Sequence, residues 1–139
     1  MNGFETLIER RSQAIRAKDL DGLMSFYTPD ILYFDIVPPL QYVGTEALRG
    51  RFRNWFEGFQ SGIRQDPSDL QIVADDDVAS TAMLITSGGT LPNGVEVERV
   101  VRATSVWRRT DDGWLIFHEH VSVPVDLATG RVADAIADD

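Results

Sequence analysis

The chain has 139 residues, of which 43% are hydrophobic and 25% charged, a composition typical of one soluble globular domain and too short for two. Its formal net charge of −9 argues against nucleic acid or an anionic membrane as a partner, and no apolar run approaches the roughly 20 residues that a membrane span needs. The chain has no cysteine, so disulfides and thiolate nucleophiles are excluded, and we expect a cytoplasmic protein.

The first sixty residues favour three helices and one strand. Apolar residues recur every three or four positions over residues 4–18, which predicts an amphipathic helix. A second, short helix is expected to start at Asp19 or Asp21 and to end before Pro29, because proline disfavours helix in the residue that precedes it. The run ILYFDIV at 31–37 is β-branched and aromatic and predicts a strand, and a third helix is expected to open at Gly44.

Four strands are expected in the rest of the chain. They are separated by short turn sequences and lie at 69–74, 78–87, 95–109 and 114–124. Helices followed by an antiparallel meander are typical of the α+β class, with the N-terminal helices packed on one face of a curved, mainly antiparallel sheet. We expect one domain over residues 1–139, with its core at about 4–124 and a C-terminal tail at 125–139.

Both histidines of the chain, His118 and His120, lie in the last predicted strand. If this strand pairs with the preceding one without a bulge, His118 lies opposite Ser105, and both imidazoles point to the face that the helices cover. Because residues alternate between faces, Glu119 then points to the other face, where Arg102 is a diagonal neighbour. That outer face is also apolar, and a second copy of the chain is the simplest cover for it. We therefore expect a homodimer formed through the outer sheet face.

The order of these elements and two segments of the chain resemble a known family. The segment FDIVPPLQYVG at 34–44 precedes the third helix, and RATSVWRRTDDGWLIFHEHVS at 102–122 forms the terminal hairpin. Over roughly residues 5–124 the chain resembles SnoaL-like and ketosteroid-isomerase-like proteins of the nuclear transport factor 2 fold. The resemblance implies a cone-shaped α+β roll of the cystatin-like type, commonly dimeric. The hairpin is also similar to the calcium/calmodulin-dependent kinase II association domain, a non-catalytic oligomerisation module of that fold.

The resemblance implies a catalytic role for one carboxylate. Counted back from Gly44, the position of the catalytic aspartate in ketosteroid isomerases is occupied by Asp35. A carboxylate in an apolar strand is expected to have its pKa raised by desolvation, which suits a general base, and the alternative is a structural carboxylate that binds the nearby loop. The two oxyanion-hole positions of those isomerases are occupied by Arg11 and Ser105, which argues against steroid isomerisation.

The histidines and several other residues complete the predicted site. His118 and His120 are interpreted either as cavity wall or as catalytic proton partners of Asp35. A third alternative is a His-x-His metal site with Asp35 as a ligand, but this spacing is common by chance, and we expect neither a metal nor a cofactor. The residues expected to bind a substrate are Tyr27, Tyr33, Trp55, Ser105 and Trp107.

The leading functional hypothesis is a cofactor-independent isomerase or lyase, such as a dehydratase, that acts on an apolar or cyclic oxygenated substrate in a hydrophobic pocket. The alternative is a non-catalytic ligand-binding or dimerisation module of the same fold. A cavity with Asp35 and an imidazole near one point favours the enzyme, whereas a cavity filled by aromatic rings favours the module.

Overall fold

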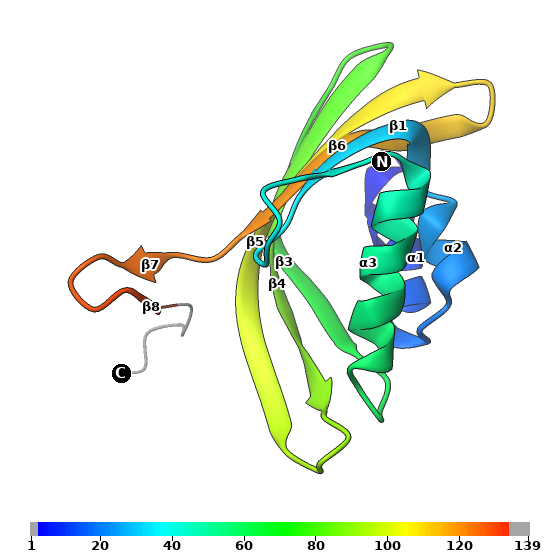
Figure 1. Ribbon diagram of the computed structural model, residues 1–139. Helices are drawn as coiled ribbons and strands as arrows, with labels where there is room; N and C mark the ends of the chain where they lie inside the picture. Colours follow the sequence, from blue (N-terminus) through cyan, green and yellow to red (C-terminus); the bar gives the residue numbers. More distant parts are fainter. Residues whose placement is uncertain (1–2, 134–139) are drawn as a thin grey trace.

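The structure is a computed structural model that describes residues 3–133, in which three helices lie on one side of a strongly curved sheet (Figure 1). The helices are α1 (Phe4–Arg16), α2 (Leu20–Met24) and α3 (Thr45–Glu57). The strands are β1 (Tyr27–Phe34), β2 (Tyr42–Val43), β3 (Arg64–Ala74), β4 (Val78–Thr90), β5 (Glu96–Thr110), β6 (Gly113–Ser122), β7 (Val125–Asp126) and β8 (Arg131–Val132). The predicted α+β class with helices on a curved, mainly antiparallel sheet is confirmed.

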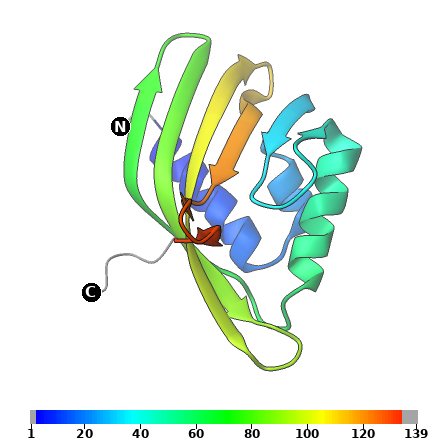
Figure 2. The ribbon, with the colours of Figure 1, turned by 60° about the vertical axis from the view of Figure 1, so that its left-hand side comes forward.

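The main sheet has six strands in the order β2-β1-β6-β5-β4-β3. Strand β1 runs parallel to β6, and every other neighbouring pair in this sheet is antiparallel. Figure 2 shows how the long strands β3 to β6 curve around the helical layer. The parallel pair places the end of the first strand next to the last long strand, so that residues about 85 positions apart in the sequence, such as Tyr33 and Glu119, become neighbours.

The helices form where their apolar residues can face the sheet. In α1, Phe4, Ile8 and Ile15 are each at most 3% exposed, as the helical spacing predicts. Helix α2 begins as expected after Asp19, whose side chain accepts a hydrogen bond of 3.0 Å from the Gly22 backbone N–H. It ends at Met24, earlier than predicted, because the residues from Tyr27 onward join the sheet as β1. The first strand therefore lies at 27–34, and not at 31–37.

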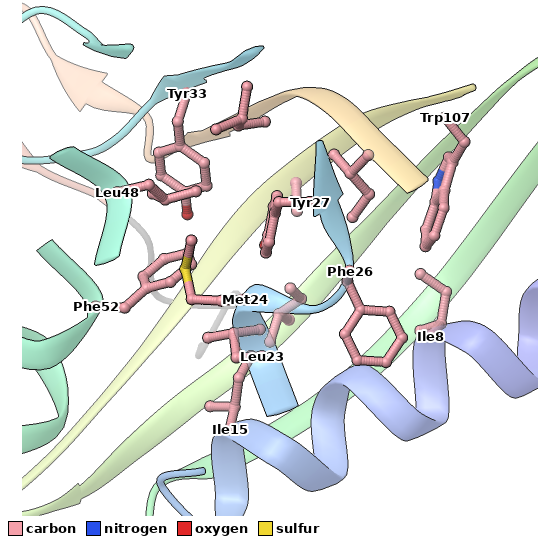
Figure 3. Packing of buried hydrophobic residues seen from close by; sticks show 14 of the residues in the cluster. Ile8, Ile15, Leu23, Met24, Phe26, Tyr27, Tyr33, Leu48, Phe52 and Trp107 are labelled. Atoms are coloured by element: carbon pink, nitrogen blue, oxygen red, sulfur yellow. The ribbon is translucent and has the colours of Figure 1, made fainter. Parts of the chain in front are cut away.

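Aromatic rings dominate the core between the helices and the sheet (Figure 3). Trp107 is fully buried, packs edge-on against Phe4 at 5.4 Å between ring centroids, and donates its indole N–H to Thr81 Oγ1 at 3.0 Å. Tyr33 and Phe52 are likewise perpendicular at 5.5 Å, which joins β1 to α3. Edge-to-face pairs of this kind add to the stabilisation that comes from burial alone.

A β-bulge in β6 overturns the predicted orientation of the last strand. Pairing follows the predicted register as far as Trp107 opposite Ile116, but the next pair is Val106 opposite His118, so that Phe117 is an extra residue on β6. One extra residue reverses the side-chain alternation of everything that follows. Glu119 therefore points to the helices, and both histidine positions after the bulge point to the outer face.

Beyond β6 the chain leaves the body of the molecule. Strands β7 and β8 form a small two-stranded hairpin that projects away from the sheet in Figure 1. The predicted tail at 125–139 is thus partly structured, and its residues 134–139 lie outside the described part of the chain. Within residues 3–133, none of the helices combines the length and apolar character that crossing a membrane requires.

Candidate functional site

A cavity of about 210 Å³ lies inside the curve of the sheet, between it and the helices. Its apolar wall consists of Ile36, Phe52, Trp55, Ile85, Val101 and Val121. Its polar lining consists of Arg11, Tyr33, Asp35, Arg51, Gln65, Ser87 and Arg99. A mainly apolar hollow with a few converging polar groups is the usual form of a small-molecule site.

Asp35 follows directly after β1 and lies on the cavity wall with its side chain 7% exposed. Its Oδ2 accepts a hydrogen bond of 2.6 Å from Arg51 Nε, and its Oδ1 accepts one of 2.7 Å from the Ile36 backbone N–H. Arg51 comes from α3, one turn after the buried Leu48, so that its guanidinium reaches the cavity from the opposite side. Since a carboxylate has about four lone-pair sites, both oxygens can still accept a further proton or hydrogen bond.

Tyr33 stands on the same wall, two residues before Asp35, as the shared alternation predicts. Figure 3 shows its ring directed from β1 toward Phe52 of α3, with the hydroxyl at the far end. Within residues 3–133 this hydroxyl has no hydrogen-bond partner. Burial, with a smaller contribution from the charge of Glu119, raises the pKa of Tyr33 well above its ordinary value. The group is therefore a protonated, available hydrogen-bond donor at neutral pH.

A buried ion pair lies beside the cavity, between α1 and β6. Arg11 Nη2 is 3.0 Å from Glu119 Oε1, and the side chains are 4% and 0% exposed. Tyr27 accepts from Arg11 Nη2 at 3.1 Å and donates its hydroxyl to Glu119 Oε1 at 2.5 Å, while Ser105 donates to Glu119 Oε2. Each oxygen of this buried carboxylate is thus hydrogen-bonded, as a buried charge requires.

Burial and the neighbouring charges keep Arg11 charged and Tyr27 protonated. Burial alone would lower the pKa of Arg11, but the Glu119 carboxylate and the two tyrosines outweigh that effect and raise it, so the guanidinium stays charged. Burial raises the pKa of Tyr27 well above its ordinary value, although the nearby Arg11 charge opposes the shift. Tyr27 therefore stays protonated and donates to Glu119.

Two buried polar atoms are left without partners. Among the described residues, Arg11 Nη1 and Gln65 Oε1 are the buried side-chain polar atoms that have no hydrogen bond. Both residues are 3% exposed and both line the cavity. Gln65 belongs to β3, which lies against α1. Native proteins satisfy nearly all such atoms, so these two are candidates for ligand contacts.

The two histidines do not enter the cavity. The Nδ1–H of His118 donates to the Leu32 carbonyl oxygen at 2.8 Å, and the exposed His120 has its ring 5.3 Å from that of Phe34. The prediction that they face the cavity was wrong because of the bulge at Phe117. For the same reason, Glu119 does not face outward to Arg102.

The other predicted residues divide between cavity and core. Tyr33 and Trp55 line the cavity, whereas Tyr27, Ser105 and Trp107 are absent from its lining and are at most 6% exposed within the core. The metal alternative needed the histidines and Asp35 to converge, and the structure places them on different faces of the sheet. In the part of the chain that the structure describes, no group of three or more His, Asp or Glu side chains is arranged to hold a metal ion.

Sequence reasoning missed four polar residues of the cavity: Arg11, Arg51, Gln65 and Ser87. Arg11 occupies a helical position between Ile8 and Ile15 on the apolar stripe of α1, and a charge in such a stripe is a sign of a buried partner. Arg51 carries a weaker signal of the same kind, one turn from Leu48. Nothing in the sequence marked Gln65 as a cavity residue, because the segment around it was interpreted as a loop.

Comparisons with known proteins agree with this architecture. The chain matches the SnoaL-like domain family over residues 5–126. It is similar to an NTF2-like protein of unknown function from Pseudomonas putida, with 27% identity, a TM-score of 0.87, and coverage of 97% of this chain and 94% of that one. A comparison with functionally curated proteins gave no match.

Two further solved structures share the fold but carry different functional names. A candidate calcium/calmodulin-dependent protein kinase II association domain from Xanthomonas campestris has 22% identity, a TM-score of 0.76, and coverage of 86% and 84% of the two chains. A candidate dehydratase of the NTF2-like family from Streptomyces avermitilis has 23% identity, a TM-score of 0.72, and coverage of 84% and 91%. Since the family match spans most of the chain, including both the helices and the curved sheet, this protein belongs to the SnoaL-like family.

Proposed function

We propose that the protein is a cofactor-independent enzyme that moves a proton on a small, apolar, oxygenated molecule, with Asp35 as the general base. The observation that carries the proposal is the nearly buried Asp35 carboxylate on the wall of an apolar cavity. The unpartnered hydroxyl of Tyr33 on the same wall supports it, because proton abstraction beside a carbonyl needs a donor for the oxygen that becomes negative. The candidate dehydratase with this fold is consistent with the same reaction class.

The proposed step uses groups that the cavity supplies. Asp35 takes a proton from a carbon next to a carbonyl group. The C–H electron pair forms the new C=C bond, and the C=O π pair moves onto the carbonyl oxygen, which accepts a hydrogen bond from Tyr33. The enolate then collapses in one of two ways. If the carbonyl compound is β,γ-unsaturated, return of the proton to the γ-carbon of the dienolate gives the conjugated isomer. If it carries a β-hydroxyl group, that group departs as water, protonated by the acid form of Asp35, and leaves the α,β-unsaturated product.

Arg51 is the positioning residue in this scheme. Its Nε holds Asp35 Oδ2 at 2.6 Å, and the Ile36 N–H holds Oδ1, so the carboxylate is fixed before a substrate arrives. A fixed carboxylate loses less entropy on reaching the reacting geometry than a mobile one does. The remaining lone pairs of Asp35 are the ones that would accept the proton.

The cavity volume limits the substrate. An apolar cavity of about 150 Å³ in an unrelated protein accommodates benzene. A cavity of about 210 Å³ therefore suits a molecule with one substituted ring, or an open chain of similar size, and is too small for a fused four-ring skeleton.

Proton abstraction can be tested before the natural substrate is identified. The protein is incubated in D₂O with a panel of one-ring and short-chain ketones, and loss of the α-proton signals is followed by ¹H NMR. We expect the wild-type protein to catalyse this exchange. The exchange rate should fall by about 100-fold or more in Asp35→Asn and by a smaller factor in Tyr33→Phe. His120→Asn, on the outer face, is the matched control and should exchange at the wild-type rate.

Exchange that survives intact in Asp35→Asn would remove the proposed base. A protein that binds the ketones but catalyses no exchange of any of them would favour the second candidate function, a non-catalytic ligand-binding module. The ion pair between Asp35 and Arg51 is the observation that favours this alternative, because it gives the carboxylate a structural partner. The fold shared with an association domain is consistent with it.

We also propose that two copies associate through the outer face of the sheet. That face is partly apolar, with Leu32, Phe34, Leu84 and Val106 among its half-buried residues. Sedimentation equilibrium at micromolar concentration should show a dimer. Thr104→Arg, which adds a charge at an exposed position on this face, should yield monomers, whereas a monomeric wild-type protein would contradict the proposal.

A further inference from the structure

We propose that the part of the cavity between α1 and β3 recognises an uncharged hydroxyl group of the ligand through Arg11 and Gln65. The inference rests on the proposed function in taking this ligand to be the molecule that reaches Asp35. It adds a second recognition point, at two buried lining residues that each have a polar atom without a partner, to a site whose reaction would occur at Asp35 and Tyr33.

The first argument is the unused bonding capacity of the two side chains. Arg11 uses Nε and Nη2 for Tyr27 and Glu119, which leaves Nη1 as a donor without a partner. Gln65 Oε1 is an acceptor without a partner. A buried polar atom that loses water without gaining a hydrogen bond destabilises the folded state, by roughly 5- to 150-fold in the folding equilibrium constant, so a partner is expected for each.

The second argument is hydrogen-bond complementarity. A group that serves both atoms must accept a hydrogen bond from Arg11 and donate one to Gln65. A hydroxyl does both through one oxygen. A carbonyl or carboxylate only accepts, and an ammonium group only donates, so each would leave one of the two atoms unpaired. Water has the same pattern as a hydroxyl, and the ligand oxygen would take the place of a bound water molecule.

The third argument is charge. The positive charge of Arg11 is already balanced by Glu119, whose side chain is fully buried 3.0 Å away. An anionic ligand at Nη1 would bring a second negative charge next to that carboxylate in a poorly solvated place. Two other charged residues of the lining, Asp35 and Arg51, also form an ion pair with each other. The site is therefore suited to an uncharged oxygen.

The test uses four ligands with the same ring and one changed substituent. They are p-xylene, 4-methylphenol, 4-methylbenzaldehyde and 4-methylbenzoate, which carry at one position a methyl, hydroxyl, carbonyl or carboxylate group. Binding to the full-length protein is measured by titration with backbone amide NMR. We expect 4-methylphenol to bind about 3- to 10-fold more tightly than p-xylene, and the carbonyl and carboxylate ligands to bind more weakly than the phenol.

Two variants show whether the preference comes from the proposed atoms. Gln65→Leu removes the acceptor but leaves the Arg11–Glu119 pair intact, and it should abolish the advantage of 4-methylphenol without weakening p-xylene. Gln71→Leu makes the same chemical change at an exposed position of the same strand and should keep the advantage. Neither substitution touches the buried ion pair, so both variants should fold.

The outcomes separate this inference from the proposed function. Equal affinity for phenol and xylene, tighter binding of the benzoate or the aldehyde, binding of none of the four, or a phenol preference that persists in Gln65→Leu would each overturn the hydroxyl subsite. Such a result leaves the Asp35-dependent deuterium exchange to be judged by its own assay. Conversely, a hydroxyl preference that depends on Gln65, in a protein without exchange activity, would support the subsite and remove the enzyme.

Discussion

The buried ion pair between Arg11 and Glu119 gives the sharpest prediction for stability. Arg11→Met keeps much of the side-chain volume but removes the charge, and leaves the Glu119 carboxylate fully buried with only the hydroxyls of Tyr27 and Ser105 as partners. Glu119→Gln does the reverse, since it leaves the charged guanidinium of Arg11 without a counter-charge. Each single substitution therefore creates an uncompensated buried charge, which is more unfavourable than having no ion pair at all.

The expected magnitude follows from the burial of the pair. Removing one partner of a buried ion pair typically lowers the free energy of unfolding by about 3–5 kcal/mol, a large part of the roughly 5–15 kcal/mol available to a domain of this size. The double variant Arg11→Met with Glu119→Gln contains no buried charge, and its glutamine still offers an oxygen to Tyr27. We expect it to lose at least about 2 kcal/mol less than the sum of the two single losses.

Urea unfolding at pH 7, followed by circular dichroism, measures these differences if the transition is two-state. The control is the exposed pair Arg64–Glu98, whose side chains are each 54% exposed and whose removal should lower the free energy of unfolding by less than about 1 kcal/mol. Single losses below about 1 kcal/mol at Arg11 and Glu119, or losses that simply add in the double variant, would refute the reasoning that the pair is desolvated and coupled.

Three further predictions concern the pH dependence of stability, a close backbone contact and helix propensity. Burial raises the pKa of both Tyr27 and Tyr33, so the folded state keeps two protons that the unfolded chain releases near pH 10. The stabilising contribution of the two tyrosines is therefore complete below about pH 10 and is lost as the pH rises further. Urea unfolding between pH 8 and 11 should show this decline, and Tyr33→Phe should make it less steep, whereas an unchanged slope would contradict the assignment. A Cβ on Gly88 would lie 2.2 Å from the backbone oxygen of Val97, so Gly88→Ala should lower the melting temperature strongly, by separating β4 from β5. Gly50 lies in α3, where an added Cβ meets nothing within 4 Å, so Gly50→Ala should instead raise the free energy of unfolding by about 0.5–1 kcal/mol. A lower free energy of unfolding in this variant would show that helix propensity does not determine the effect of the substitution.

Much of the fold could be predicted because its signals are repeated along the chain. The stripe of α1 contains several apolar residues at helical spacing, and the loss of one would not change the interpretation. The long strands are each bounded by turn sequences, so their order and antiparallel pairing followed. Element ends were less predictable, as β1 shows: Tyr27 was assigned to a helix because its neighbours are apolar, yet pairing with β6 requires it in the sheet.

The candidate site was less predictable because it depends on single residues. Asp35 and Tyr33 were identified on the correct wall, one by resemblance and the other by alternation. The histidines were placed on the wrong face. Their placement depended on strict alternation of side chains between the two faces of the sheet, and one inserted residue, Phe117, reverses that alternation. No local feature of the sequence marks that bulge. A long-range feature did exist: the Arg11 guanidinium and the Glu119 carboxylate each occupy an otherwise apolar position, and each is the counter-charge that the other needs.

The bulge also determines which polar groups lie beside the cavity. Without it, Glu119 would point to the outer face and Arg11 would be an unpaired charge beside the core, which is strongly unfavourable. With it, Glu119 neutralises Arg11 and, together with Tyr27, holds the guanidinium by Nε and Nη2, so that only Nη1 remains for a ligand. A charged side chain fixed in this way behaves toward the cavity as a directed, electrically balanced donor. The selectivity for an uncharged oxygen that we propose at Arg11 and Gln65 therefore follows from the same inserted residue that turns the histidines outward.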